Sequence, residues 1–151
     1  MSVAPQSVAP DIGVYDAENH AILVAEVKGK PDSSTQWAAQ LRRNLAAHAS
    51  FPEARYFMVV TPNTIYLWTR PVGTQLAPAD ATFDARVVLR PYLERFRAPN
   101  LTETALEIMV AAWLDSLIDG YGRSKLPPDV HDRLEEAGLL KALQGARLEQ
   151  S

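Results

Sequence analysis

The stretch PDIGVYDAENHAILVAEVKGK, residues 10–30, contains the two strand-like runs that decide the fold. Residues 11–16 and 21–28 are rich in strand-forming side chains, and the AENH segment between them suits a tight reversal. The second run is apolar on both faces, which is typical of a central strand covered on both sides. We therefore predict an antiparallel hairpin whose second strand is buried within a sheet.

The segments after this hairpin alternate between helical and strand-like patterns. Residues 33–49 predict a helix, because Ser and Thr capping candidates precede a run with large apolar residues four positions apart. Residues 55–61 and 64–70 predict a second hairpin around a Pro-Asn turn. Helix and strands together predict an α/β fold with a mixed β-sheet core flanked by helices.

The second half of the chain is mainly helical by pattern. Residues 83–90 predict a short strand, and the PYLERF segment after it is irregular or helical and ends near Ala98 and Pro99. Residues 101–118 predict a helix, capped by Asn100 or Thr102, and the tail at 128–147 predicts further helix. We expect a single domain over residues 1–151. Within it we distinguish a core at 9–70 and a C-terminal extension at 83–151.

Composition restricts the function classes. The net charge of -3 gives no general attraction to a polyanion, so nucleic acid must be held by a local patch. The absence of cysteine removes disulfides, thiolate metal sites and cysteine nucleophiles. No leader pattern and no apolar run of about 20 residues occurs, so we expect a cytoplasmic protein that does not enter a membrane.

Glu26 and Lys28 carry the first chemical signal. The two residues are two positions apart on one strand, so their side chains point to the same face of the sheet. Such a pair is, by itself, more often a structural ion pair than a site. Asp11 opens the neighbouring strand and can approach the pair, although an aspartate after proline also caps turns. Two carboxylates and the Val27 carbonyl are oxygen ligands of the kind that Mg²⁺ prefers.

These residues resemble the PD-(D/E)XK motif. The stretch PDIGVYDAENHAILVAEVKGK, together with the helix and the TPNTIYLW hairpin that follow it, is similar to the nuclease domain at the N-terminus of type I restriction R subunits. The resemblance covers about residues 9–70. It implies a restriction endonuclease-like fold with Asp11, Glu26, Lys28 and Gln40 in the site, and Mg²⁺, replaceable by Mn²⁺, as cofactor. The tyrosine that often follows the family's glutamine four residues later is Asn44 here.

The front of the chain departs from this family. The family's core usually begins with a helix, which often carries an acidic residue near the site, and a further strand before the motif aspartate. In this sequence only nine residues precede Pro10. Three explanations stay open: the helix at 101–118 fills that place, a second subunit of a homodimer does, or the core is reduced.

The resulting interpretation is a metal-dependent endo- or exonuclease whose expected substrate is DNA. Lys30, Arg42 and Arg43 are the candidates for phosphate contacts, although two arginines on an exposed helix face are more often solvated. The three histidines lack His or Cys neighbours at ligand spacing, so no zinc site is expected. The alternatives are a non-catalytic module of the same fold that binds a protein or nucleic acid, and an unrelated α/β fold. A solvent-open notch around the motif favours the enzyme, and a filled site favours the module.

Overall fold

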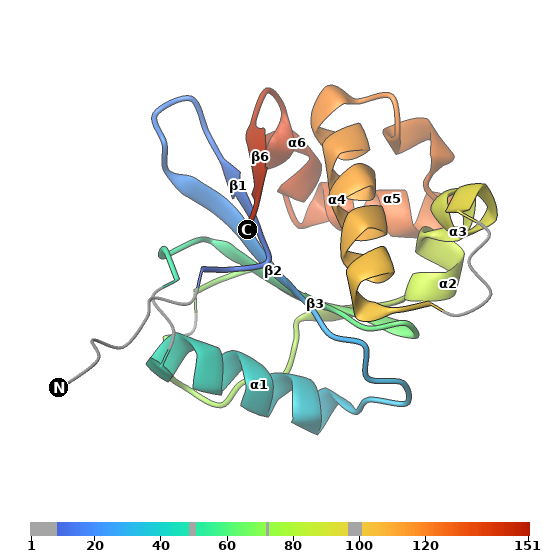
Figure 1. Ribbon diagram of the computed structural model, residues 1–151. Helices are drawn as coiled ribbons and strands as arrows, with labels where there is room; N and C mark the ends of the chain where they lie inside the picture. Colours follow the sequence, from blue (N-terminus) through green and yellow to red (C-terminus); the bar gives the residue numbers. More distant parts are fainter. Residues whose placement is uncertain (1–8, 49–50, 72, 97–100) are drawn as a thin grey trace, which may run out of the picture.

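The computed structural model describes residues 9–48, 51–71, 73–96 and 101–151, and is built around one mixed sheet (Figure 1). Six strands form this sheet in the order β5-β4-β3-β2-β1-β6. Their bounds are β1 Ile12–Tyr15, β2 Ala21–Val27, β3 Tyr56–Val60, β4 Thr64–Trp68, β5 Ala81–Asp84 and β6 Arg147–Gln150.

Both predicted hairpins are confirmed. β1 pairs antiparallel with β2, and β3 pairs antiparallel with β4. β2 and β3 run parallel, with Val27 beside Val60. A parallel pair needs a long crossover, and helix α1 (Thr35–His48) provides it. The helix begins after Ser34, whose Oγ accepts a hydrogen bond from the Trp37 amide at 3.0 Å.

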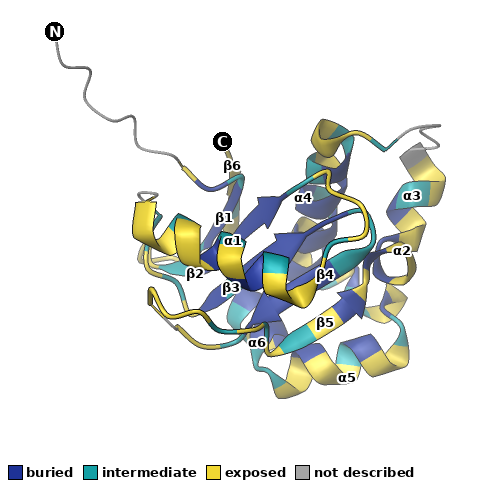
Figure 2. Cartoon of the chain, turned by 90° about the horizontal axis from the view of Figure 1, so that it is seen from below, coloured by how far each residue is buried: buried dark blue, intermediate teal, exposed yellow. Residues whose placement is uncertain are grey.

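Helices cover both faces of the sheet. Helix α1 lies alone on one face, with exposed residues on its outer side and buried strands beneath it (Figure 2). On the other face lie α4, α5 and α6, while α2 and α3 continue from β5 near one edge (Figure 1). The bounds of these helices are α2 Ala85–Val88, α3 Arg90–Phe96, α4 Glu103–Asp119, the 3₁₀ helix η1 Arg123–Lys125, α5 Pro128–Glu136 and α6 Leu139–Leu143.

The two-sided apolar pattern of β2 creates two cores. Leu23, Ala25 and Val27 point into the larger core, which contains most of the buried residues of α4. The smaller core lies under α1, where Ala38 packs on the sheet with Trp68 and its neighbours. Because alternate side chains of a strand point to opposite faces, Val24 and Glu26 lie on the α1 side.

Helix α4 folds back over the sheet. Met109 and Trp113 are only 1% and 3% exposed, and α4 contacts both β2 and β6. Its Thr102 Oγ1 accepts a hydrogen bond from the Ala105 amide at 3.1 Å and caps the helix. The helix predicted at 101–118 is therefore buried on the sheet of its own chain. The alternative cap at Asn100, like residues 49 and 98–99, lies outside the described residues.

Two expectations for the second half were wrong. The strand predicted at 83–90 ends at Asp84, whose side chain accepts from the Arg86 amide at 3.0 Å and starts α2. The helix predicted from 128 to about 147 is divided into α5 and α6 and ends at Leu143, and the strand β6 begins at Arg147. β6 pairs antiparallel with β1, so it covers an edge that would otherwise be unpaired. In the described part of the chain no helix is long and apolar enough to cross a membrane.

Candidate metal centre

The hairpin brings Asp11 and Glu26 together at one end of the sheet. Ile12 is the partner of Ala25, which places Asp11 beside Glu26 one position further. Asp11 Oδ2 accepts a hydrogen bond from the Val27 amide at 2.9 Å, so the carboxylate continues the β1–β2 ladder. The predicted approach of the two acidic side chains is confirmed.

Glu26 is a buried acid. Glu26 is only 3% exposed. The pKa of Glu26 is raised to about 8, mainly by burial and also by the hydrogen bond and negative charge of Asp11, against the opposing effect of Lys28. At neutral pH Glu26 therefore keeps a proton in its hydrogen bond with Asp11. A pKa shifted by burial and by a second carboxylate is common at functional sites.

Helix α4 adds two acidic residues that the sequence reasoning missed. Burial raises the pKa of Glu107, as do the charges of Asp11 and Glu103 and a hydrogen bond with Asp11. Glu103 Oε1 accepts from the Gly29 amide at 2.8 Å. A Cβ at Gly29 would lie 3.2 Å from Glu103 Cβ, so the glycine permits a close approach. The first two turns of α4 thus dock on the end of β2.

The signal for Glu107 was present but ambiguous. Glu103 and Glu107 lie four residues apart on the predicted 101–118 helix, which places both on one helical face. On a lone helix this spacing is typical of a solvated face. Only the packing of α4 against the motif distinguishes these two acids from other exposed acids of the chain.

Three carboxylates lie near this end of the sheet, with Asp11 close to both Glu26 and Glu107. The ligand atoms of these three residues do not all lie within 4.8 Å of one another. Carboxylate oxygens are the preferred protein ligands of Mg²⁺ and Mn²⁺, and a divalent cation would remove the repulsion that keeps Glu26 protonated. Asp11 and Glu26, which the β1–β2 register places side by side, would be the main ligands of such an ion.

Lys28 lies next to this set. Its amide donates to the Val60 carbonyl at 2.9 Å, which extends the parallel ladder beyond β2. Its positive charge favours the ionised form of Glu26, whose pKa would otherwise be higher. The side chain is half-buried, as expected of a cation at the end of a buried strand.

Gln40 and the basic residues that were predicted to contact phosphate lie in different environments. Gln40 is exposed on α1 and lines two surface cavities, neither of which includes Asp11, Glu26 or Lys28. Lys30 is exposed with its Nζ 5.8 Å from the centre of the Trp37 ring, and Arg43 is exposed on α1. Arg42 was expected on an exposed helix face, but it is buried at 6% exposure, because the helix turns it toward the sheet.

Access to the site is narrow. Glu26 is almost completely covered, and none of five surface cavities formed by described residues includes Asp11, Glu26 or Lys28. The half-buried Asp11 and Glu107 are the parts of the carboxylate set that solvent reaches. None of these five cavities is the open notch at the motif that would favour an enzyme.

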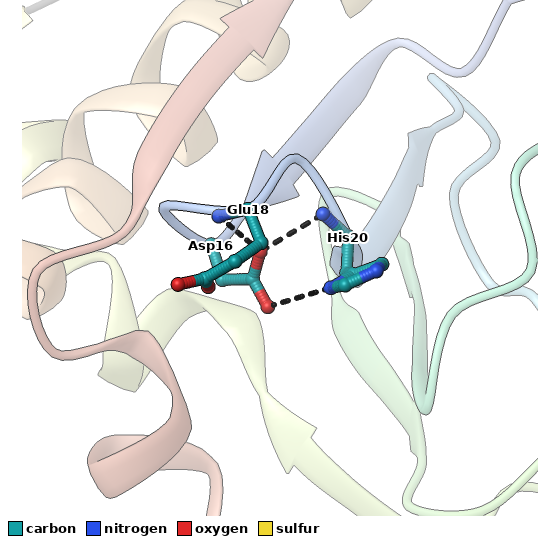
Figure 3. A group of neighbouring side chains, drawn as sticks. All are labelled: Asp16, Glu18 and His20. Atoms are coloured by element: carbon teal, nitrogen blue, oxygen red, sulfur yellow. Dashed lines mark hydrogen bonds and ion pairs between the residues drawn. The ribbon is translucent and has the colours of Figure 1, made fainter.

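Two groups of His and acidic residues elsewhere in the described chain have metal-like spacing. Asp16, Glu18 and His20 in the β1–β2 turn each offer a ligand atom within 4.8 Å of the others (Figure 3), and so do His131, Asp132 and Glu135 of α5. Asp16 Oδ1 accepts from the amides of Glu18 and His20, both at 2.9 Å. These bonds hold the turn together, so the first group is explained by its structural role.

Comparisons with known proteins give no relative. No family model matches the chain, and no significant match was found among curated proteins or among solved structures.

Proposed function

We propose that this protein is a Mg²⁺-dependent nuclease of the PD-(D/E)XK type that hydrolyses phosphodiester bonds, with DNA as the expected substrate. The observation that carries the proposal is the β1–β2 register, which places Asp11 beside the buried Glu26 at the end of the sheet, with Glu107 of α4 near Asp11. Three acids rarely gather at a half-buried point unless a cation or bound protons offset their repulsion.

Each residue has a role in the proposed reaction. Asp11, Glu26 and the Val27 carbonyl would hold the ion, and Glu107 would add its negative charge nearby. When bound, the ion polarises the phosphate and lowers the pKa of a water nucleophile. Lys28 stabilises the negative charge that develops on the phosphate oxygens as the water oxygen forms its bond to phosphorus and the leaving oxygen departs. Gln40 is exposed, and its proposed role is to contact the nucleic acid near the site.

The order of elements supports a rearranged version of the family's core. The resemblance calls for a helix with an acidic residue and a further strand before the motif aspartate. Here α4 carries Glu107, and β6 pairs with β1 on the side away from β2. Both elements follow the motif in the chain. We therefore propose a permuted restriction endonuclease-like fold, in which the expected helix and strand come from the C-terminal half.

A second candidate function follows from the burial of Glu26. A carboxyl that is 3% exposed and protonated at neutral pH also suits a closed structural site. The alternative is a non-catalytic module that keeps the fold and binds a protein or nucleic acid.

Metal binding and cleavage distinguish the two candidates. We expect Mn²⁺ titration calorimetry to show binding that strengthens toward pH 8, where Glu26 gives up its proton, and cleavage of at least one DNA or RNA substrate. Asp11→Ala and Glu26→Ala should abolish both, because an oxygen ligand is lost. Lys28→Ala should retain metal binding and slow cleavage, while Gln40→Ala should have a milder effect. Wild-type protein that binds no metal and cuts no substrate would favour the module.

A further inference from the structure

A cavity of about 240 Å³ lies between the sheet and the C-terminal half of α1. Val24 and Phe57, which are paired across β2 and β3, form part of its wall. The segments before β3 and after β4 complete it. None of the roles assigned above uses this cavity.

The cavity wall includes the buried guanidinium of Arg42. Its Nη1 donates to the Gly73 carbonyl at 3.1 Å, while its buried Nε finds no acceptor among the described residues. The same guanidinium lies 5.6 Å from the centre of the Phe57 ring and 6.0 Å from that of Trp68. A buried donor without an acceptor is unusual in a folded protein. Because Arg42 lines the cavity, its guanidinium places a largely unpaired positive charge beside the cavity.

The remaining wall offers two aromatic side chains and a second cation. Phe51 and Phe57 are stacked, with ring centres 6.3 Å apart and planes inclined by 24°. Arg70 lines the cavity with a side chain that is 76% exposed, and its Nε is 3.9 Å from Asp80, so this pairing is weak. Glu53 lines the cavity too, so its charge partly offsets the two arginines. Arg55 also lines the cavity, but its guanidinium lies over the Tyr56 ring, so we assign it no contact with a ligand.

The cavity lies on the same face of the sheet as Glu26. Val24 and Glu26 are two positions apart on β2, so both face the α1 side and are separated by about 7 Å along the strand. Glu26 itself does not line the cavity.

We propose that this cavity binds one nucleotide of a single-stranded nucleic acid, with the base against Phe51 and Phe57 and the phosphate on Arg42 and Arg70. Stacking on aromatic rings tolerates every base, and arginine binds phosphate through paired N–H donors. A base in the cavity is unpaired, so the substrate is a single strand or a frayed end. The link to cleavage rests on the proposed function, but nucleotide binding does not.

Nucleotide binding is tested without metal. We expect deoxyadenosine 5′-monophosphate, titrated in the presence of EDTA, to shift the amide resonances of Gly73 and Thr74, and adenosine to bind more weakly. Arg70→Gln and Arg42→Met, which keeps the apolar packing, should each weaken binding about tenfold, corresponding to the loss of one charge-assisted contact. Arg90→Gln, which removes an exposed arginine of α3, should change nothing.

Strand preference is tested with Asp11→Asn, which disables the proposed metal centre and prevents cleavage. This variant should bind the nucleotide as wild type does, and should bind a single-stranded oligonucleotide at least about tenfold more tightly than the blunt duplex of the same sequence. If Arg42→Met does not fold, Arg70→Gln and Phe51→Leu provide the same test.

The two proposals fail separately. No nucleotide binding by wild type, or binding unaffected by the arginine variants, overturns the nucleotide site even if the protein cleaves DNA. Equal affinity for single strand and duplex also overturns it. Nucleotide binding that the arginine variants weaken, in a protein that neither binds metal nor cuts any substrate, supports the site and refutes the nuclease.

Discussion

Glu26 keeps a proton that an exposed glutamate would release well below neutral pH. The ordinary pKa of a glutamate is 4.5, and burial with Asp11 nearby raises that of Glu26 to about 8. Below pH 4.5 the folded and unfolded states both hold the proton. Between pH 4.5 and 8 only the folded state holds it, so the free energy of unfolding falls as pH rises and levels off above about 8.

The substitution Glu26→Gln removes this titration while leaving an amide that can donate to Asp11. We expect the variant to be more stable than wild type, by a difference that grows from pH 5 to pH 9. At pH 8.5, Mg²⁺ should raise the stability of wild type and leave Glu26→Gln nearly unchanged, because only the carboxylate binds the ion. Urea unfolding across this pH range measures both effects. Parallel stability curves for the two proteins would show that Glu26 does not titrate as described.

Glu107 is the acid that the sequence alone did not single out. We expect Glu107→Gln to weaken Mn²⁺ binding by about tenfold, since outer ligands and their partners commonly contribute 10- to 100-fold to metal affinity. Asp115→Asn is the matched control, because Asp115 is exposed two turns further along α4. Calorimetry compares the two variants. Equal affinities would assign Glu107 a structural role only.

At the scale of elements, the N-terminus of α4 connects the extension to the motif. Thr102 caps the helix, and Glu103 in its first turn holds the Gly29 amide beyond β2. The Thr102 cap therefore affects both the stability of α4 and the position of Glu107, which lies one turn after Glu103.

The substitution Thr102→Ala removes the acceptor for the Ala105 amide. We expect it to lower the free energy of unfolding by about 1 kcal/mol, the usual effect of losing a Ser or Thr cap. Thr104→Ala, at an exposed position in the same turn, should have no such effect. Denaturant titration of both variants is the measurement, and a Thr102→Ala protein as stable as Thr104→Ala would contradict the assigned cap.

At the scale of the whole molecule, the two ends of the described chain lie together. The Ser151 amide donates to the Asp11 carbonyl at 3.1 Å, because β6 runs antiparallel to β1. Joining Ser151 to Ala9 by a short linker therefore requires little rearrangement of the sheet.

A circular permutant that begins at Leu101 would place α4 and β6 before the motif aspartate. We expect it to fold with the same circular dichroism spectrum and a similar melting temperature, because native contacts do not depend on the order of the elements. A linear variant that ends at Ala146 is the contrasting control, since it lacks β6 and leaves the β1 edge unpaired. A permutant that unfolds as readily as this truncated form would refute the permuted arrangement.

Local patterns in the sequence determined much of the first half of the fold. The hairpin at 11–28 and the helix that begins near Thr35 follow from side-chain periodicity and turn residues, which act over a few positions. The approach of Asp11 to Glu26 followed from the same logic, because antiparallel strands fix which residues are neighbours.

Contacts between distant segments were decided only by the tertiary structure. Residues 147–150 carry no strand pattern, and they form β6 because the edge of β1 supplies hydrogen-bond partners. Arg42 could be read as exposed, since a helical pattern does not say how far a face turns toward the sheet. Glu107 meets Asp11 because the apolar face of α4 is buried on the sheet, an interaction that depends on every element around it.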